Sequence, residues 1–222
     1  MASGLAHELS QPLAAVSNYL VSCQRRMEVD GDWDKEKLRA AVRLALGQSE
    51  RAANIIGHIK GLVKKQGYEH DWLNVNLLVE STLVFLEDEL TRCGIAVNMD
   101  LQPLPQVMAC QVEIVQVLLN LYKNAIEAMS ASPQRILTIT SSMTASGDVM
   151  VAVGDTGSGV LPEQAEQVFN PFHTSKTGGL GLGLAICRSF VDHHGGRIWV
   201  ESAGQSGAKF CFTLSVQGRS AK

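Results

Sequence analysis

Apolar residues near the amino terminus recur at alternating steps of three and four, a spacing that restricts the segment to paired helices. One such run extends from Ala2 to Cys23 and another from Leu38 to Val63, with Asp30-Gly31-Asp32 between them as a break and a helix cap. The two apolar seams predict an antiparallel helical hairpin. Because a two-helix core is thin, we expect two copies of the chain to form a four-helix bundle, and hence a homodimer. A plain coiled-coil hairpin is the alternative for this segment taken alone.

The heptad spacing stops near residue 64, and mixed helix and strand patterns follow it. Helices are predicted over Leu77–Arg92, Val112–Met129 and Leu184–His194. Strands are predicted over Ile95–Leu101, Ile136–Met143, Val149–Val153, Arg197–Ser202 and Ala208–Val216, the last four as two hairpins. This mixture predicts an α+β fold, with the helical hairpin followed by an α/β sandwich. We expect the hairpin at 1–66, a polar linker at 67–76, the sandwich at 77–217 and a tail at 218–222.

Charge and composition exclude some classes of partner. The net charge of -3 gives no reason to expect nucleic acid or a membrane surface, and no apolar run approaches the roughly 20 residues of a membrane span. The five cysteines are scattered without a C-x-x-C pair, which argues against a zinc site or a disulfide framework. The chain begins inside a helical pattern and lacks a signal peptide. We therefore expect a cytoplasmic fragment, with any membrane anchor outside it.

His7 is predicted to lie on the outward face of the first helix, since the apolar seam passes through Leu5 and Leu9. The adjacent Glu8 can accept the Nδ1 proton and leave Nε2 as a nucleophile. Pro12 cannot donate a hydrogen bond to the carbonyl of Glu8, so the helix should loosen or bend there. Without these neighbours, a solvated surface histidine would be the better interpretation.

A first motif for nucleotide binding lies on the amphipathic helix, where Asn120 and Asn124 are one turn apart and share a face. Their amide oxygens are suitable hard ligands for Mg²⁺. Lys123 lies between them in the sequence and adds a positive charge. Either asparagine alone could equally be a surface amide.

A second motif, Asp155-Thr156-Gly157-Ser158-Gly159, follows a predicted strand. An aspartate there can accept a hydrogen bond from an adenine amino group, while Gly157 and Gly159 let the backbone approach the base. A hairpin turn could look the same. A third motif, Phe169-Asn170-Pro171-Phe172, precedes a polar run with Lys176, which suggests a lid whose lysine reaches a phosphate. The alternative is a surface loop with buried Phe anchors.

A fourth motif is a glycine-rich run that opens a helix, whose amino terminus favours anions. Its predicted ligand-binding residues are Gly179, Leu180, Gly181, Leu182 and Gly183. The run lacks the G-K-[ST] ending of a Walker A motif. Each motif alone is a modest signal, but all four in this order behind a His-Glu-x-x-x-Pro hairpin are hard to produce by chance.

Together these motifs resemble the transmitter core of bacterial two-component sensor histidine kinases. His7–Leu13 resembles their H box, Asn120–Met129 the N box, Asp155–Gly159 the G1 box, Phe169–Phe172 the F box, and Gly179–Gly183 the G2 box. The H box, with Thr174-Ser175-Lys176, looks closest to the oxygen-sensing and dicarboxylate-sensing subgroup. The resemblance covers nearly the whole chain.

The resemblance implies an ATP-dependent kinase in which His7 is the phosphoacceptor and Glu8 its base. Asn124 would bind Mg²⁺ beside Asn120, and Asp155 would hold adenine. The family also implies a dimeric bundle, an ATP-binding sandwich of the gyrase type, and a response regulator receiver domain that takes the phosphoryl group. The glycines of the G1 and G2 boxes would shape the adenine pocket and border the lid.

One departure concerns Gln11. Many relatives carry Thr or Asn at this position, where it orients water to dephosphorylate the regulator, and the longer side chain of Gln leaves this phosphatase activity open. Two rival functions keep part of the pattern: a clamp ATPase of the gyrase type and a non-enzymatic dimeric scaffold. The H box and the lack of a transducer domain argue against the clamp, and the intact nucleotide motifs argue against the scaffold.

Overall fold

The computed structural model describes residues 2–28, 35–63, 70–174, 181–202 and 207–216. The chain divides into two compact units, Met1–Gln66 and Gly67–Lys222. In the described residues, no helix is both long enough and apolar enough to cross a bilayer. Each unit is described by itself below.

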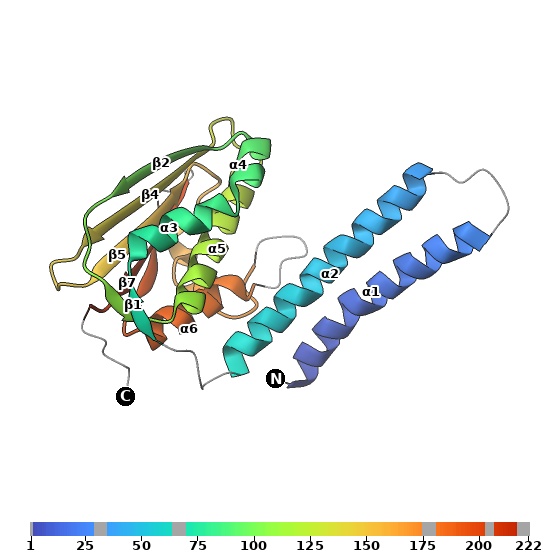
Figure 1. Ribbon diagram of the computed structural model, residues 1–222, viewed down its shortest axis with the longest axis horizontal. Coiled ribbons are helices and arrows are strands. Elements are labelled where there is room, and N and C mark those ends of the chain that lie inside the picture. Colours follow the sequence, from blue (N-terminus) through green and yellow to red (C-terminus); the bar gives the residue numbers. More distant parts are fainter. Residues whose placement is uncertain (1, 29–34, 64–69, 175–180, 203–206, 217–222) are drawn as a thin grey trace. The chain divides into compact units, whose positions relative to one another are not determined.

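The first unit is a hairpin of two long helices, α1 (Ala2–Glu28) and α2 (Lys35–Val63), which pack along each other (Figure 1). Helix α1 continues through Pro12, which is buried against its neighbours. Cys23 is buried on the same seam, as the apolar spacing predicts.

The seam predicted for the second helix is only partly correct. Ala45 and Ala52 are buried, but Val42 is 43% exposed and Ser49 is also exposed. Small or half-buried side chains at Ala41 and Gln48 replace them on the inner face, because α2 turns a narrow row of small residues toward α1. Larger apolar side chains are thereby left on the outside of the hairpin.

The second unit is built on a five-stranded sheet with the order β2-β4-β5-β7-β6 (Figure 1). The strands are β2 (Ala96–Leu101), β4 (Ile136–Met143), β5 (Val149–Asp155), β6 (Ile198–Ser202) and β7 (Ala208–Leu214). Strand β2 runs parallel to β4, and all other neighbours are antiparallel. A separate two-stranded sheet pairs β1 (Asp71–Leu73) with β3 (Val107–Ala109).

The helices of this unit cover one face of the large sheet (Figure 1). They are α3 (Val75–Val84), α4 (Glu87–Cys93), α5 (Gln111–Ala128) and α6 (Gly183–His193), with short 3₁₀ turns η1 (Pro162–Gln164) and η2 (Gln167–Phe169). Strand residues alternate, so that Leu137 and Ile139 of β4 face the helices while Thr138 is exposed. The α+β prediction is confirmed.

The core lies between α5 and the sheet, and Tyr122 and Phe212 are among its largest fully buried side chains. The Tyr122 hydroxyl donates a hydrogen bond to the Val79 carbonyl at 3.4 Å, and burial raises the pKa of this phenol. Helix α5 is therefore packed into the core and hydrogen-bonded to α3 through Tyr122.

Most predicted elements lie within a few residues of their observed positions, but the single helix predicted over Leu77–Arg92 is wrong. The chain forms α3 and α4 with a break at Phe85 and Leu86, because Leu86 turns inward to the core at φ -112° and ψ 5°. Acidic residues then start α4, and Gly94 ends it in the left-handed conformation at φ 64°.

The polar segment predicted as a linker overlaps the sandwich. Asp71–Leu73 forms β1, and α3 begins at Val75 after Asn74 caps it with its side chain. Three-residue strands such as β1 and β3 carry too few alternating residues to show in the sequence pattern. The folded unit therefore includes the second half of the predicted linker.

Candidate functional site

Helix α5 carries the two asparagines of the first predicted motif. The Asn120 Nδ2 donates a hydrogen bond to the Gly183 carbonyl at 3.4 Å, which ties α5 to the first residue of α6. Asn124 lies one turn further along α5 and is half-buried, whereas Lys123 is exposed. The structure thus brings the first motif next to the end of the glycine-rich motif.

Asp155 is the last residue of β5, and its position is fixed by the loop that follows. Its Oδ1 accepts a hydrogen bond from the Gly157 amide at 2.8 Å. Thr156 anchors the same loop from the side, because its hydroxyl donates to the Gln134 carbonyl at 2.7 Å and accepts the Ile136 amide at 3.0 Å. The half-buried carboxylate of Asp155 therefore lies at the carboxyl end of the central strand β5, where the Gly157 amide helps to orient it.

Gly157 packs against the carboxyl end of α5. A Cβ at this position would lie 2.6 Å from the Ala128 carbonyl carbon, and the Ser158 amide donates to the Ala128 oxygen at 3.3 Å. Gly159 adopts a positive φ of 75°. The loop that holds Asp155 is thus docked on the same helix that carries Asn120.

The glycine-rich motif and the Phe motif meet at Gly181. The Phe172 amide donates to the Gly181 carbonyl at 3.0 Å, and a Cβ on Gly181 would lie 2.6 Å from backbone atoms of Phe172 and His173. Phe172 is exposed and has a positive φ of 66°. Phe169 is buried and contacts Phe210 edge to face, which fits the interpretation of Phe anchors beneath a loop.

Leu182 differs from the predicted ligand-binding role. It is the N-cap residue of α6 and is buried in the core, so its side chain packs and only its backbone can approach a ligand. The predicted residues Lys176, Gly179 and Leu180 lie outside the described residues. Gly183 has space around it, since an added Cβ would meet only the Asn120 side chain at 3.8 Å.

His7 and Glu8 lie in α1, in the other unit, and their side chains lie outside the described ones. Gln11, one turn after His7, is exposed.

Gly207 lies beside Asp155 in the candidate site but was not predicted to be part of it, and Thr156 stands in the predicted motif without an assigned role. Gly207 has a φ of 113°, and an added Cβ would lie 1.9 Å from the Asp155 carbonyl oxygen. The sequence marks Gly207 only as a turn residue, because its contact with Asp155 depends on the pairing of β5 with β7.

The groups brought together here can bind three kinds of chemical group. It combines a carboxylate that can accept from an amino group, amide oxygens that suit a hard cation, and the amino terminus of an 11-residue helix that favours anions. All three are connected through α5. An adenine nucleotide carries both a base amino group and anionic phosphates, which the carboxylate and the helix terminus can bind.

Comparison with known proteins agrees with this chemistry. Residues 110–218 match the family described as "Histidine kinase-, DNA gyrase B-, and HSP90-like ATPase". Sensor protein TdiS of Thauera aromatica is 39% identical over 97% of this chain, and sensor protein FixL of Bradyrhizobium diazoefficiens is 38% identical over 96%. The chain spans only 40% and 43% of the lengths of these two relatives.

Solved structures point the same way. The catalytic domain of histidine kinase ThkA is 35% identical, with a TM-score of 0.61 over 68% of this chain and 99% of that chain. A structure of ThkA in complex with the response regulator TrrA covers 97% of this chain and 61% of that chain, with a TM-score of 0.75 and 28% identity. Motifs, fold and relatives agree, and the chain belongs to the sensor histidine kinase family.

Proposed function

We propose that this protein transfers the γ-phosphoryl group of ATP to His7 and then to an aspartate of a response regulator. The proposal is carried by the position of α5, which connects both halves of the candidate nucleotide site. The loop after Asp155 packs on the carboxyl end of α5, and Asn120 in the middle of α5 contacts Gly183. Family membership supports ATP as the substrate.

In this proposal the Asp155 carboxylate accepts a hydrogen bond from the adenine amino group. Gly157 lets the loop pack on Ala128 of α5, and Gly207 lets the backbone pack against Asp155, because a Cβ at either position would clash. Gly159 supplies the positive φ that the same loop needs. The triphosphate extends toward α6, where Gly179, Gly181 and Gly183 offer backbone N–H groups. Lys123 and Lys176 supply positive charge near the phosphates.

The donor set of the site fits Mg²⁺. Asn120 donates to the Gly183 carbonyl through its Nδ2, so this hydrogen bond does not involve the amide oxygen of Asn120. We propose Asn124 as the metal ligand, with Asn120 lining the same site. When bound, the ion neutralises phosphate charge as the γ-phosphoryl group leaves.

The proposed transfer needs alignment more than covalent help from the protein. The Nε2 lone pair of His7 attacks the γ-phosphorus, the bond to the bridging oxygen breaks, and ADP leaves. Glu8 accepts the Nδ1 proton, which keeps the product phosphohistidine neutral at the ring. We propose that Gln11 orients water for the opposing step, hydrolysis of the regulator's phosphoaspartate.

The hairpin at 1–66 is proposed as the dimerisation and phosphotransfer domain. The catalytic domain is proposed at 77–217 after a linker at 67–76, and β1 and the start of α3 add the second half of that linker to the folded domain. Large apolar side chains exposed on the hairpin support a homodimer; they are Leu13, Leu20, Val21, Met27, Val42, Leu44 and Leu46. The ThkA complex with TrrA supports a response regulator as partner. Residues 218–222 are proposed as a tail.

Incubation with γ-labelled ATP and Mg²⁺ tests the proposal directly. The chain should acquire an acid-labile, base-stable label, as phosphohistidine does. His7→Ala should abolish the label while nucleotide affinity stays within about twofold. A label that survives in His7→Ala would refute the assignment of the phosphoacceptor.

A second variant separates binding from transfer. Asp155→Asn should weaken ATP binding at least tenfold, because the amide presents a donor to the adenine amino group. Its loss of label should be reversed by raising the ATP concentration. ATP hydrolysis without any phosphoprotein would instead favour the clamp ATPase.

A further inference from the structure

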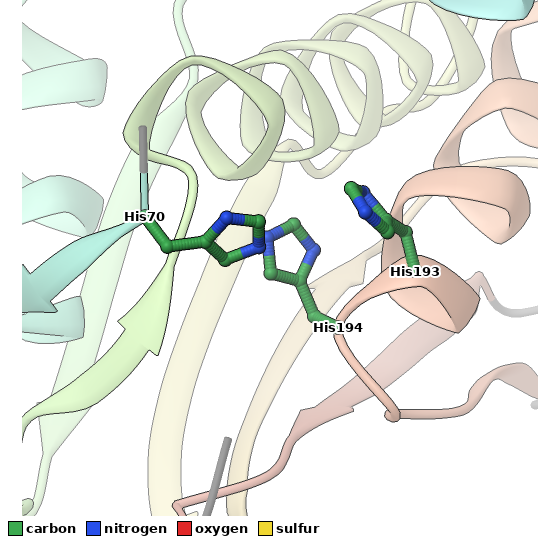
Figure 2. A group of neighbouring side chains, drawn as sticks. All are labelled: His70, His193 and His194. Atoms are coloured by element: carbon green, nitrogen blue, oxygen red, sulfur yellow. The ribbon is translucent and has the colours of Figure 1, made fainter. Parts of the chain in front are cut away.

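Three imidazoles, one from before β1 and two from the end of α6, lie close together in the second unit (Figure 2). His70 precedes β1, His193 ends α6, and His194 follows it as the C-cap residue. Their ring centroids are 5.3–5.5 Å apart, and each ring offers a nitrogen such that all three nitrogens lie within 4.8 Å of one another. None of these histidines has a role in the proposed phosphoryl transfer.

Two of the rings are oriented by fixed acceptors. The buried carboxylate of Glu113 lies 2.9 Å from Nδ1 of His193, and the Phe190 carbonyl lies 2.7 Å from Nδ1 of His194. A carbonyl oxygen can only accept, so Nδ1 of His194 carries the proton, and the carboxylate favours the same tautomer for His193. In both rings the lone pair is therefore on Nε2. Carboxylate and carbonyl acceptors behind a histidine are the usual outer partners of metal-ligating imidazoles.

Access and charge also suit a cation. His70 is exposed and the His193 side chain is 54% exposed, so the cluster opens to solvent on their side. The His194 side chain is 1% exposed and forms the buried side of the cluster. The Glu113 carboxylate, 3.7 Å from His194, adds a buried negative charge beside the rings.

We propose that His70, His193 and His194 bind one divalent transition-metal ion of the Zn²⁺ class, with solvent in the remaining coordination position. Three imidazoles suit Zn²⁺ and its neighbours, whereas Mg²⁺ prefers oxygen ligands. Zn–N bonds of about 2.0–2.1 Å place tetrahedral ligand nitrogens roughly 3.3 Å apart. Ion binding therefore needs the nitrogens to move closer together, and the exposed ring of His70 can rotate toward the other two.

One existing hydrogen bond must break when the ion binds. Nε2 of His194 accepts the Cys110 amide at 2.9 Å, and one lone pair cannot serve both that N–H group and a metal. Cys110 is the N-cap residue of α5, the helix that carries Asn120 and Asn124. The proposed ion therefore competes with a contact at the start of that helix, which gives the site a distinctive signature.

Zn²⁺ titration of the full chain by calorimetry, after removal of metal with a chelator, tests the proposal. We expect one ion per chain at this site, and at least tenfold weaker binding for His70→Ala and for His193→Ala. The combined variant His70→Ala/His193→Ala should lose the site entirely. His58→Ala is the matched control outside the cluster and should bind as the unchanged chain does.

Glu113→Gln tests the outer partner without removing a ligand, and we expect it to weaken Zn²⁺ binding by about 10- to 100-fold. Because His194 is buried and its replacement could unfold the chain, the Cys110 amide serves as its reporter. Zn²⁺ should shift the Cys110 amide resonance and speed its hydrogen exchange. The proposal is overturned if no stoichiometric binding occurs, if binding survives in His70→Ala/His193→Ala, or if the Cys110 amide does not respond.

Discussion

The two units of this chain differ in the size of the apolar side chains that they bury. In the hairpin, the described side chains that are buried are small: Pro12, Cys23, Ala45 and Ala52. The second unit buries Tyr122, Phe212 and many branched aliphatic side chains in one continuous core. Large buried side chains contribute most to stability, so the second unit can be stable in one chain. For the hairpin we expect stability to depend on the partner surface of the proposed dimer.

Cutting the chain between the units should give the largest effect. A fragment of residues 67–222 should unfold cooperatively at a midpoint that does not change with protein concentration. A fragment of residues 1–66 should lose helical circular dichroism on dilution, because its helices are stabilised only as a dimer. If the helicity of the hairpin fragment did not change with protein concentration, the hairpin would not need a partner, and the proposed difference between the two units would be wrong.

A charge on the outer face of the hairpin should break the dimer of the whole chain. Leu20 is 53% exposed and lies midway between Leu13 and Met27, which are seven residues away on either side and also exposed. Leu20→Glu should raise the dimer dissociation constant at least about 100-fold, because two carboxylates would be buried in the interface. Analytical ultracentrifugation measures this. Met99→Glu, on an exposed position of β2, is the control and should leave the dimer intact.

Within the second unit, alanine substitutions at two glycines of the predicted nucleotide motifs should have different effects on stability. Gly157→Ala would place a Cβ 2.6–2.7 Å from atoms of Ala128, so we expect a loss of about 2 kcal/mol of unfolding free energy together with nucleotide affinity. Gly183→Ala meets only a side chain at 3.8 Å and should change stability by less than about 1 kcal/mol. Denaturant titration of both variants checks the difference, and equal losses would contradict it.

Periodicity predicted those elements that are long and one-sided. The helix at 112–129 and the strand Ile136–Met143 follow the observed elements closely, because each repeats its pattern over at least two turns or four pleats. The break at Phe85 and Leu86 was not predicted, because one exposed and one buried apolar residue in sequence are also compatible with a continuous helix. The outer position of Val42 depends on the rotation of α2, which a 3-4 spacing does not fix.

Within the candidate site, the local contacts of a contiguous motif were predictable. Asp155 and Gly157 fall within five residues, and their hydrogen bond is local. Gly207 and the His70 cluster could not be predicted, because each meets its partners only after strands and helices distant in sequence are packed together. Leu182 was assigned to ligand binding because it stands in a glycine-rich run, although its side chain belongs to the core.

The smallest expected effect on stability concerns one buried hydroxyl group in the core of the second unit. Among the described side chains, Thr82 is fully buried on α3 and its Oγ1 has no hydrogen-bond partner. Thr82→Val keeps the shape of the side chain and removes the unsatisfied group, so it should raise the unfolding free energy by about 1 kcal/mol. Ser141→Ala is the opposite control, since the Ser141 hydroxyl donates to Asn76 Oδ1 at 2.8 Å and its loss should cost about 1 kcal/mol. If Thr82→Val destabilises the chain as Ser141→Ala does, the Thr82 hydroxyl must have a partner in solution, and the core would be less dry than its apolar lining indicates.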